Sequence, residues 1–287
     1  MTAPRFLPQR WRQNAAIAGH AQAIAGILDT PPIEQRQDGL VLFASIGSTS
    51  LLPAMVALKS LWRPLQRGRV ALLDDGSLTA EDRAVLAHHF ADPELVRADT
   101  VNMGSFPAGQ GWESLLTMLE RRGGEYWLRV APDSVTLGDV PEIAGTIGAN
   151  RSLTDLSAEA ESEHPLPFAE AFRSDLPRMD RWRYLDAGGG LTGLAAGQGG
   201  RAIAEAALAL LPAPGPNLTA GKNARRAAGF IVANEIAPVC LPRTLYRSWK
   251  QGEDWRVGPA FLRFAEPKVR AGAWADASRA AIALLAR

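Results

Sequence analysis

The sequence predicts an α/β fold with a mostly parallel central sheet and flanking helices. Three short, mainly apolar runs lie at 40–44, 69–73 and 125–130, and each has the composition of a strand that is buried on both faces. Segments with helical periodicity separate these runs. Because strands that alternate with helices are typical of parallel sheets, we expect the three runs to be neighbouring strands.

The first half of the chain divides into clear elements. We expect a helix at 14–28, a strand at 40–44, a helix at 52–62, a strand at 69–73, a helix at 80–90, a short strand at 95–96, a helix at 111–122 and a strand at 125–130. Pro53 fits the first turn of its helix, where a proline has no hydrogen bond to lose. Thr79, with Asp82 three residues later, resembles a capping box for the helix at 80–90.

After about residue 150 the alternation weakens. We expect a Gly-rich strand–turn segment at 183–194, a helix at 200–211, a loop at 212–221, a helix at 223–234, short strands at 237–241 and 259–264, and a closing helix at 275–287. The chain therefore divides into an N-terminal helical extension at 1–39 and two halves of one unit, at 40–150 and 151–287.

Composition excludes several kinds of protein. A net charge of +1 over 287 residues gives no field that favours nucleic acid or an anionic membrane. The single cysteine, Cys240, excludes an internal disulfide and a cysteine-based metal site. The N-terminal stretch lacks the apolar core of a signal peptide, and no apolar run approaches the roughly 20 residues that cross a bilayer. We therefore expect a cytoplasmic protein without a transmembrane segment.

The glycine run at 188–193 has the spacing G-x-G-x-x-G of dinucleotide-binding loops. Such a loop requires a helix that opens inside the motif and an acidic residue after the next strand, and neither is expected here. We therefore predict a flexible turn. The hypothesis of a nicotinamide-dependent enzyme has no support in the sequence other than this run. The sequence contains neither the P-loop motif nor the G-x-S-x-G of hydrolases.

Two strand ends carry acidic residues. L-L-D-D-G-S at 72–77 and A-P-D at 131–133 are each, taken alone, compatible with ordinary turns. Together with V-T-L-G-D-V-P-E-I at 135–143, they resemble the D-D-G-S and Asp-x-Asp segments of nucleotide-sugar glycosyltransferases of the GT-A fold. The resemblance extends over about residues 40–270 and is nearest to glycosyltransferase family eight and related bacterial glycosyltransferases.

The resemblance implies a GT-A-like unit in which residues 40–150 bind the nucleotide and residues 151–287 form the acceptor side. The donor would be a nucleoside-diphosphate sugar, and the acceptor is unknown. The segment Y-L-D-A-G-G at 184–189 is similar to the family's F-N-A-G segment. The loop at 45–50 is placed like its first nucleotide-binding loop.

Roles for single residues follow from the same resemblance. Ala44, Ser45 and either Asp74 or Asp75 would contact the nucleotide. The remaining candidates are Asp133 and Asp186 as catalytic residues, Trp112 and Gly188 along the sugar and acceptor side, and Arg263 and Lys268 at the diphosphate. Glu113, beside Trp112, would border the donor pocket. For Trp112 and Glu113, a buried tryptophan beside a capping glutamate is the plainer interpretation.

Two departures from the family concern its metal. In the family, two carboxylates hold a divalent cation that bridges the donor diphosphate, because hard oxygen ligands suit Mg²⁺ and Mn²⁺. Here Ala131 stands at the first aspartate position, and Arg263 stands at the position of a later metal histidine. With Asp133 alone, we expect Mn²⁺ or Mg²⁺ to bind weakly, with the help of the diphosphate. Basic residues such as Arg263 and Lys268 would then neutralise the phosphates, unless their segment is a solvated surface loop.

Two functions stay open at this point. One is glycosyl transfer with weak or no metal dependence, which the retained Asp74, Asp75 and Asp133 favour. The other is a catalytically inactive GT-A-like protein that binds a nucleotide or a partner without turnover, which Ala131 favours.

Overall fold

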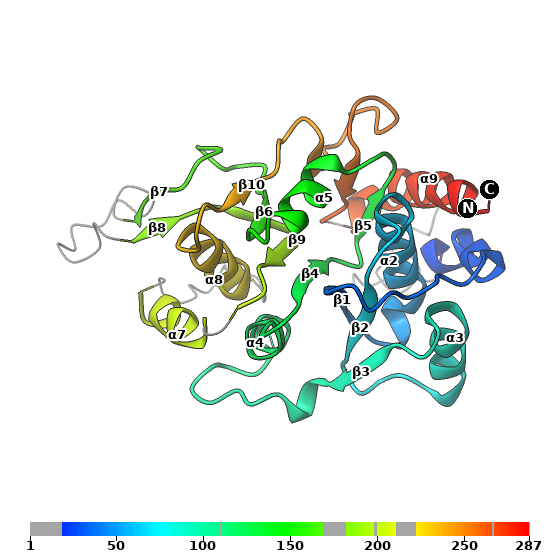
Figure 1. Ribbon diagram of the computed structural model, residues 1–287. Coiled ribbons are helices and arrows are strands. Elements are labelled where there is room, and N and C mark those ends of the chain that lie inside the picture. The colour runs from blue at the N-terminus through cyan, green and yellow to red at the C-terminus, as the bar shows by residue number, and fades with distance from the viewer. Residues whose placement is uncertain are drawn as a thin grey trace, which may run out of the picture.

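The computed structural model describes residues 19–109, 111–168, 182–197, 200–210, 222–265 and 267–286. A seven-stranded sheet with the order β10-β6-β9-β4-β1-β2-β3 runs through the molecule (Figure 1). Its strands are β1 (Leu40–Ile46), β2 (Arg69–Asp74), β3 (Glu94–Arg97), β4 (Tyr126–Val130), β6 (Leu153–Leu156), β9 (Ala187–Leu194) and β10 (Val239–Cys240).

The sheet is mostly parallel, as predicted. β1 pairs in parallel with β2 on one side and with β4 on the other, and β2 pairs in parallel with β3. The three runs predicted to be neighbouring buried strands therefore have that arrangement. Only β9 runs against its neighbours, β4 and β6, whereas β10 is again parallel to β6.

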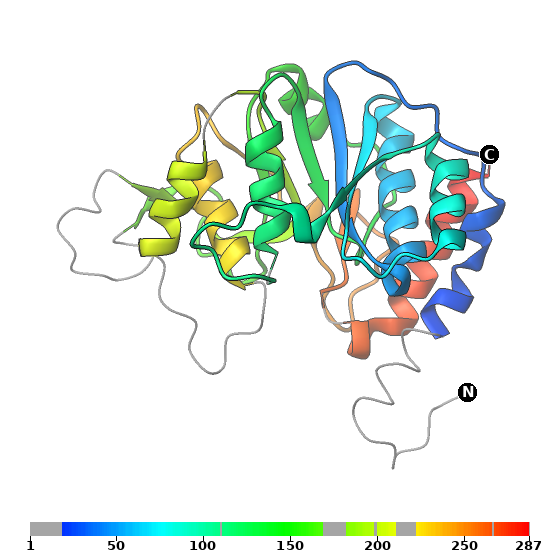
Figure 2. The same cartoon turned by 90° about the horizontal axis from the view of Figure 1, so that it is seen from below.

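Helices cover both faces of the sheet, and Figures 1 and 2 show the two layers. One layer holds η1 (Ala25–Asp29), α2 (Leu51–Leu65), α3 (Ala80–Phe90), α5 (Pro141–Gly148) and α9 (Pro267–Leu285). The other holds α4 (Trp112–Arg121), α7 (Arg201–Leu210) and α8 (Lys222–Ala233). Two 3-10 turns, η2 (Ser48–Ser50) and η3 (Ala98–Thr100), lie in connections. None of the helices in the described part of the chain is long and apolar enough to cross a membrane.

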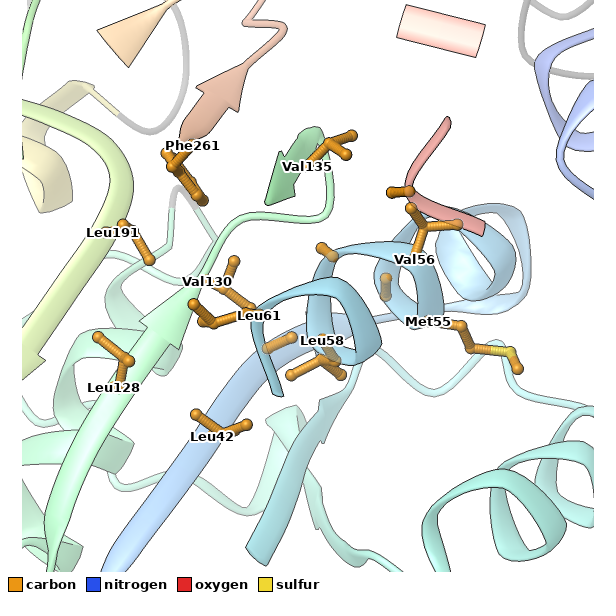
Figure 3. Packing of buried hydrophobic residues seen from close by; sticks show 14 of the residues in the cluster. Leu42, Met55, Val56, Leu58, Leu61, Leu128, Val130, Val135, Leu191 and Phe261 are labelled. Carbon is orange, nitrogen blue, oxygen red and sulfur yellow. The ribbon is translucent and has the colours of Figure 1, made fainter. Parts of the chain in front are cut away.

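Strand periodicity distributes β1 between two separate cores. Leu42 and Ala44 point into the layer that contains α2, whereas Val41 and Phe43 point into the layer that contains α4. Figure 3 shows Leu42 and the β4 side chains facing α2 in the first core. Both faces of the strand are thus apolar, which explains the continuous run that made it predictable.

The helix at 80–90 was predicted with its cap, and α3 has the expected bounds. Thr79 Oγ1 accepts a hydrogen bond from the Asp82 amide at 3.1 Å, and Asp82 Oδ2 accepts one from the Thr79 amide at 2.9 Å. This reciprocal pair satisfies two of the amides that have no partner within the first helical turn.

A second, three-stranded sheet consists of β11 (Tyr246–Ser248), β12 (Phe261–Arg263) and β5 (Ser134–Thr136). β12 is antiparallel to β5, and Arg263 is paired in register with Ser134. This pairing brings a segment near the C-terminus next to the end of β4. A two-stranded ribbon of β7 (Leu166–Pro167) and β8 (Arg183–Tyr184) lies elsewhere in the second half.

The second half differs from the prediction in several places. The glycine run predicted as a flexible turn lies in β9, a fully buried strand. The short strands β6, β7 and β11 were not predicted, and α9 begins at Pro267, eight residues earlier than expected. The predicted loop at 212–221 and the first part of the predicted helix at 14–28 lie outside the described residues.

Candidate functional site

The loops after β1 and β2 meet at the carboxyl-end edge of the parallel strands. The Asp75 amide donates to the Ile46 carbonyl at 3.0 Å, and the Ser48 amide donates to Ser77 Oγ at 2.9 Å. A side chain at Gly47 would overlap the Asp75 carboxylate, so the absence of a Cβ allows the two loops to approach. Ligands of open α/β sheets bind at this edge.

The two acids of the D-D-G-S segment have different environments. Asp74 is 1% exposed, and its carboxylate accepts hydrogen bonds from the Gly76 amide and from Arg83 at 2.8 and 2.5 Å. The Asp75 carboxylate is exposed and accepts from the amide and hydroxyl of Ser77 at 2.9 and 2.6 Å. Asp74 therefore stabilises the turn, and Asp75 is the acid that a ligand can reach.

The other two nucleotide-site candidates also differ. Ala44 is completely buried, and its side chain belongs to the core on the α2 side of the sheet. Ser45, one residue later, is half-buried at the strand end. A bound nucleotide could touch Ser45, but it could not reach the side chain of Ala44.

Arg263 and Asp133 form an ion pair at the end of β4. Arg263 Nε lies 3.2 Å from both carboxylate oxygens of Asp133, and the two side chains are 19% and 20% exposed. Arg263 Nη1 also donates to the Gly188 carbonyl, and the Phe264 amide donates to the Asp133 carbonyl at 2.7 Å. The pairing of β12 with β5 thus brings together two residues that are 130 positions apart.

A second carboxylate and a second guanidinium, those of Asp155 and Arg129, lie within electrostatic reach of this ion pair. Asp155 in β6 is fully buried and accepts hydrogen bonds from the amides of Gly190 and Leu191 at 3.1 and 2.9 Å. Burial raises the pKa of Asp155, although these amides and Arg263 favour its charged form. Burial also lowers the pKa of Arg129, and the nearby positive charge of Arg263 adds to that effect.

The glycine run gives these charged side chains room. A Cβ at Gly188 or Gly190 would collide with the Asp155 carboxylate. Gly189 has a φ of +79°, and a Cβ there would lie 2.9 Å from Arg225 Cδ and 3.0 Å from Arg263 Nη1. The run is therefore a strand without side chains against which arginines and a buried aspartate pack, which explains its glycines without a dinucleotide.

The residues at this point do not fit the divalent cation that the fold family implies. Ala131 offers no ligand, and the carboxylate of Asp133 already faces the guanidinium of Arg263, whose positive charge would repel a metal ion. In the described ranges, no group of three or more His, Cys, Asp or Glu side chains is placed to hold a metal ion. The described residues at the end of β4 therefore do not form a ligand set for Mn²⁺ or Mg²⁺.

Asp186 borders a separate hollow of about 380 Å³. The Asp186 carboxylate accepts a hydrogen bond from the Ser157 hydroxyl, and its carbonyl accepts from the Ser157 amide at 2.8 Å. The hollow is lined by Glu159, Ala160, Glu161, Ser162, His164, Leu166, Tyr184, Leu185, Asp186 and Arg226. Asp186 lies two residues before Gly188, whose carbonyl accepts a hydrogen bond from Arg263.

The remaining candidates lie in other surroundings. Trp112 is fully buried, and its ring centroid lies 4.8 Å from that of Phe106 in the α4 core. The Glu113 carboxylate accepts a hydrogen bond from the Gly109 amide ahead of α4, as a capping side chain does. Lys268 belongs to α9, but its side chain lies outside what the structure describes. The surroundings of Trp112 and Glu113 therefore match a buried core tryptophan and a capping glutamate.

Three site residues were not among the sequence-based candidates: Arg129, Asp155 and Arg225. Arg129 interrupts an otherwise apolar strand, which was the one available signal. Asp155 lies in a strand that was not predicted, and Arg225 is one of two adjacent arginines in a helix. Nothing in their spacing indicates that they converge on the glycines at 188–190.

No protein-family model matches the sequence, and no curated protein matches it. Solved structures do resemble it. The apo structure of WbbM, a bifunctional glycosyltransferase, matches with a TM-score of 0.52 and 12% identity, covering 82% of this chain and 47% of that one. GlyE from Streptococcus pneumoniae matches with a TM-score of 0.52 and 12% identity, covering 87% and 62%. An active-site mutant of LgtC gives 0.50 and 11%, covering 83% and 95%.

The fold is GT-A-like. At these identities the similarity concerns the fold and not the activity. The chain spans about half the length of WbbM and less than two thirds of GlyE.

Proposed function

We propose that this protein transfers a sugar from a nucleoside-diphosphate sugar to an acceptor hydroxyl, without dependence on a tightly bound metal. The observation that carries the proposal is the pairing of Arg263 with Asp133 at the same sheet edge as the exposed Asp75. The GT-A-like fold, which several glycosyltransferases share, supports it.

The strand order supports an extended donor site. Asp75 follows β2 and Asp133 follows β4, and β1 separates the two strands. Adjacent strands lie about 4.8 Å apart, so the two strand ends are roughly 10 Å apart. A nucleoside held at Ser45 and Asp75 could extend its diphosphate across this distance toward Arg263. The sugar would then lie over Gly188, toward Asp186.

The reaction breaks the bond between the anomeric carbon and the diphosphate oxygen and forms a bond to the acceptor oxygen. Negative charge grows on the leaving diphosphate, and Arg263 can stabilise it because a guanidinium stays protonated and donates in a fixed fork. The proton of the acceptor hydroxyl would pass to Asp186, which borders the hollow. Asp133 is the weaker candidate for a base, because Arg263 neutralises it.

Turnover tests the proposal directly. Purified protein would be incubated with a panel of uridine and guanosine diphosphate sugars in EDTA and, separately, in Mn²⁺, and the released diphosphate would be measured. We expect release from at least one donor in EDTA, and its loss in Asp186→Asn. Donor release that requires Mn²⁺ would contradict the metal-independent chemistry.

A second function, binding without turnover, is favoured by Ala131 and by the engaged state of Asp133. It predicts that nucleoside diphosphates raise the melting temperature while no donor is cleaved. A ligand at one hundred times its Kd stabilises the folded state by about 2.7 kcal/mol, which a thermal-shift assay detects. Both functions therefore predict binding of nucleoside diphosphates, and only glycosyl transfer predicts cleavage of a sugar donor.

A further inference from the structure

Three arginines from distant parts of the chain converge on Gly189. Arg129 in β4 donates through Nη1 to the Gly189 carbonyl at 3.4 Å. Arg263 of β12 approaches the same glycine with its Nη1 and Arg225 of α8 with the Cδ of its alkyl stem, since a Cβ on Gly189 would lie 3.0 Å and 2.9 Å from these atoms. The three arginine side chains therefore meet beside Gly189, at the start of the strand that pairs with β4.

The cluster carries one more positive charge than its carboxylates neutralise. Arg263 is paired with Asp133, and Arg129 lies within electrostatic reach of Asp155 and Asp133. Arg225, in contrast, has no carboxylate within ion-pair distance among the described residues, and its Nε is buried without a hydrogen-bond partner. The Arg225 side chain as a whole is half-buried, so its remaining guanidinium donors are available to an anion.

We propose that Arg225 and Arg263 form a clamp that binds the diphosphate of the donor without a divalent cation. That the bound donor carries a nucleotide and a sugar rests on the function proposed above, whereas binding of the diphosphate can be tested alone. In this arrangement Asp133 is a positioning residue: it holds the Nε side of Arg263 and leaves the Nη2 side free of any partner in the described structure. Phosphate oxygens suit that free side, because guanidinium groups bind them through parallel hydrogen bonds.

The clamp gives Asp133 the opposite role to a metal ligand. If Asp133 held a cation, its conversion to asparagine would weaken diphosphate binding, and the effect would depend on Mn²⁺. If Asp133 only orients Arg263, the same change removes a negative charge from beside the anion and keeps a side-chain oxygen for Arg263 Nε. Diphosphate binding should then be unchanged or tighter.

Calorimetric titration with inorganic pyrophosphate in EDTA tests the clamp. We expect binding to the wild-type protein, and binding roughly tenfold to hundredfold weaker in Arg225→Gln and in Arg263→Gln, because each loses charged hydrogen bonds. Arg256→Gln is the matched control, since that side chain is 63% exposed and contacts only its neighbours in sequence, with an ion pair to Asp254 and a position over the Trp255 ring, in the described structure. Pyrophosphate affinity within a factor of two of wild type in Arg225→Gln would overturn the clamp.

Arg263→Gln leaves Asp133 without its partner, so its folding would be checked by circular dichroism and thermal melting. The double variant Arg263→Gln with Asp133→Asn removes both charges and keeps the test open if the single variant unfolds. For Asp133→Asn alone, we expect pyrophosphate binding in EDTA at least as tight as in wild type. The positioning role of Asp133 would be refuted if Asp133→Asn weakened pyrophosphate binding and the size of the loss depended on Mn²⁺.

The clamp and the proposed function can fail separately. Arginine-dependent pyrophosphate binding without cleavage of any sugar nucleotide would support the clamp and reject glycosyl transfer. Donor cleavage in EDTA that Arg225→Gln leaves unchanged would support transfer and reject the clamp. Uridine and guanosine serve as further probes, because Arg225→Gln should leave nucleoside binding unchanged.

Discussion

His89 is expected to make the protein sensitive to acid. It is 2% exposed on α3, and its Nδ1 lies 3.0 Å from the ammonium nitrogen of Lys59, which is also buried. The ammonium group donates to Thr30 Oγ1 and to the Pro31 carbonyl, each at 2.7 Å. Nδ1 must therefore act as an acceptor. Its protonation would remove that hydrogen bond and put two cations in contact.

The size of the effect follows from the pKa. Burial, with Lys59 adding repulsion, lowers the pKa of His89 from 6.5 to about 4. The unfolded state then binds more protons than the folded state between these values, so stability is present above pH 6.5 and is lost as the pH falls toward 4. At 1.36 kcal/mol per pKa unit the upper limit is about 3 kcal/mol, and solvent screening reduces the expected loss to about 2 kcal/mol.

His89→Asn isolates this contribution. The asparagine Oδ1 can occupy the place of Nδ1 and accept from Lys59, but it does not titrate. Urea unfolding at pH 7 and at pH 4.5 gives the free energy of unfolding of each variant by linear extrapolation. We expect His89→Asn to lose about 2 kcal/mol less than wild type between the two pH values. His164→Asn, at an exposed position away from α3, is the control and should behave like wild type. The reasoning is wrong if His89→Asn loses as much as wild type.

Three further outcomes are expected. Thr79→Ala removes the cap of α3 and should lower the free energy of unfolding by about 1 kcal/mol in urea titrations, whereas Thr79→Ser should retain most of it. Glu125→Gln breaks the two-bond pair with Arg69, at 2.9 and 2.6 Å, and should cost about 1–2 kcal/mol by the same measurement. Asp75→Ala should weaken nucleoside binding at least tenfold in calorimetry with the melting temperature unchanged, and equal affinity would remove Asp75 from the site.

The first half of the fold was predictable because its signals are local. β1, β2 and β4 are apolar on both faces, and the capping residues of α3 lie next to the helix that they stabilise. Such patterns depend on neighbours in sequence, so the sequence alone reveals them. The parallel orientation of the three strands followed from the rule that alternating strands and helices form parallel sheets.

The second half was less predictable because its stabilising partners are distant. β6 contains Thr154 and Asp155, both completely buried, and the amides that satisfy Asp155 come from β9. Without knowledge of β9, such a segment has the composition of a loop. β9 itself contains glycines, which have little intrinsic strand preference, and it forms a strand because β4 and β6 pair with it on both sides.

The candidate site shows the same division. Its acids could be located because each follows a predicted strand, but the sequence could not say what each carboxylate faces. Asp74 is used within its turn and Asp75 is exposed, although the two are adjacent. Arg225 reaches Gly189 because α8 packs closely on the chain at Leu185. At Gly229 in α8, a Cβ would overlap the Leu185 carbonyl. That approach is a property of the packed fold.

Asp133 illustrates why a retained residue does not define a retained role. A carboxylate at the end of β4 can hold a cation supplied by the solvent or a cation supplied by the chain. The first choice needs a second anionic ligand, and Ala131 lacks one. The second needs a basic side chain on a neighbouring strand, and β12 provides Arg263 in register with β5. A covalently attached guanidinium that is always charged would lower the entropic cost of assembling a diphosphate site and would make that site independent of metal concentration. If Arg263 binds the diphosphate, the loss of the metal ligands and the gain of the arginine are a single change in how one charge is supplied.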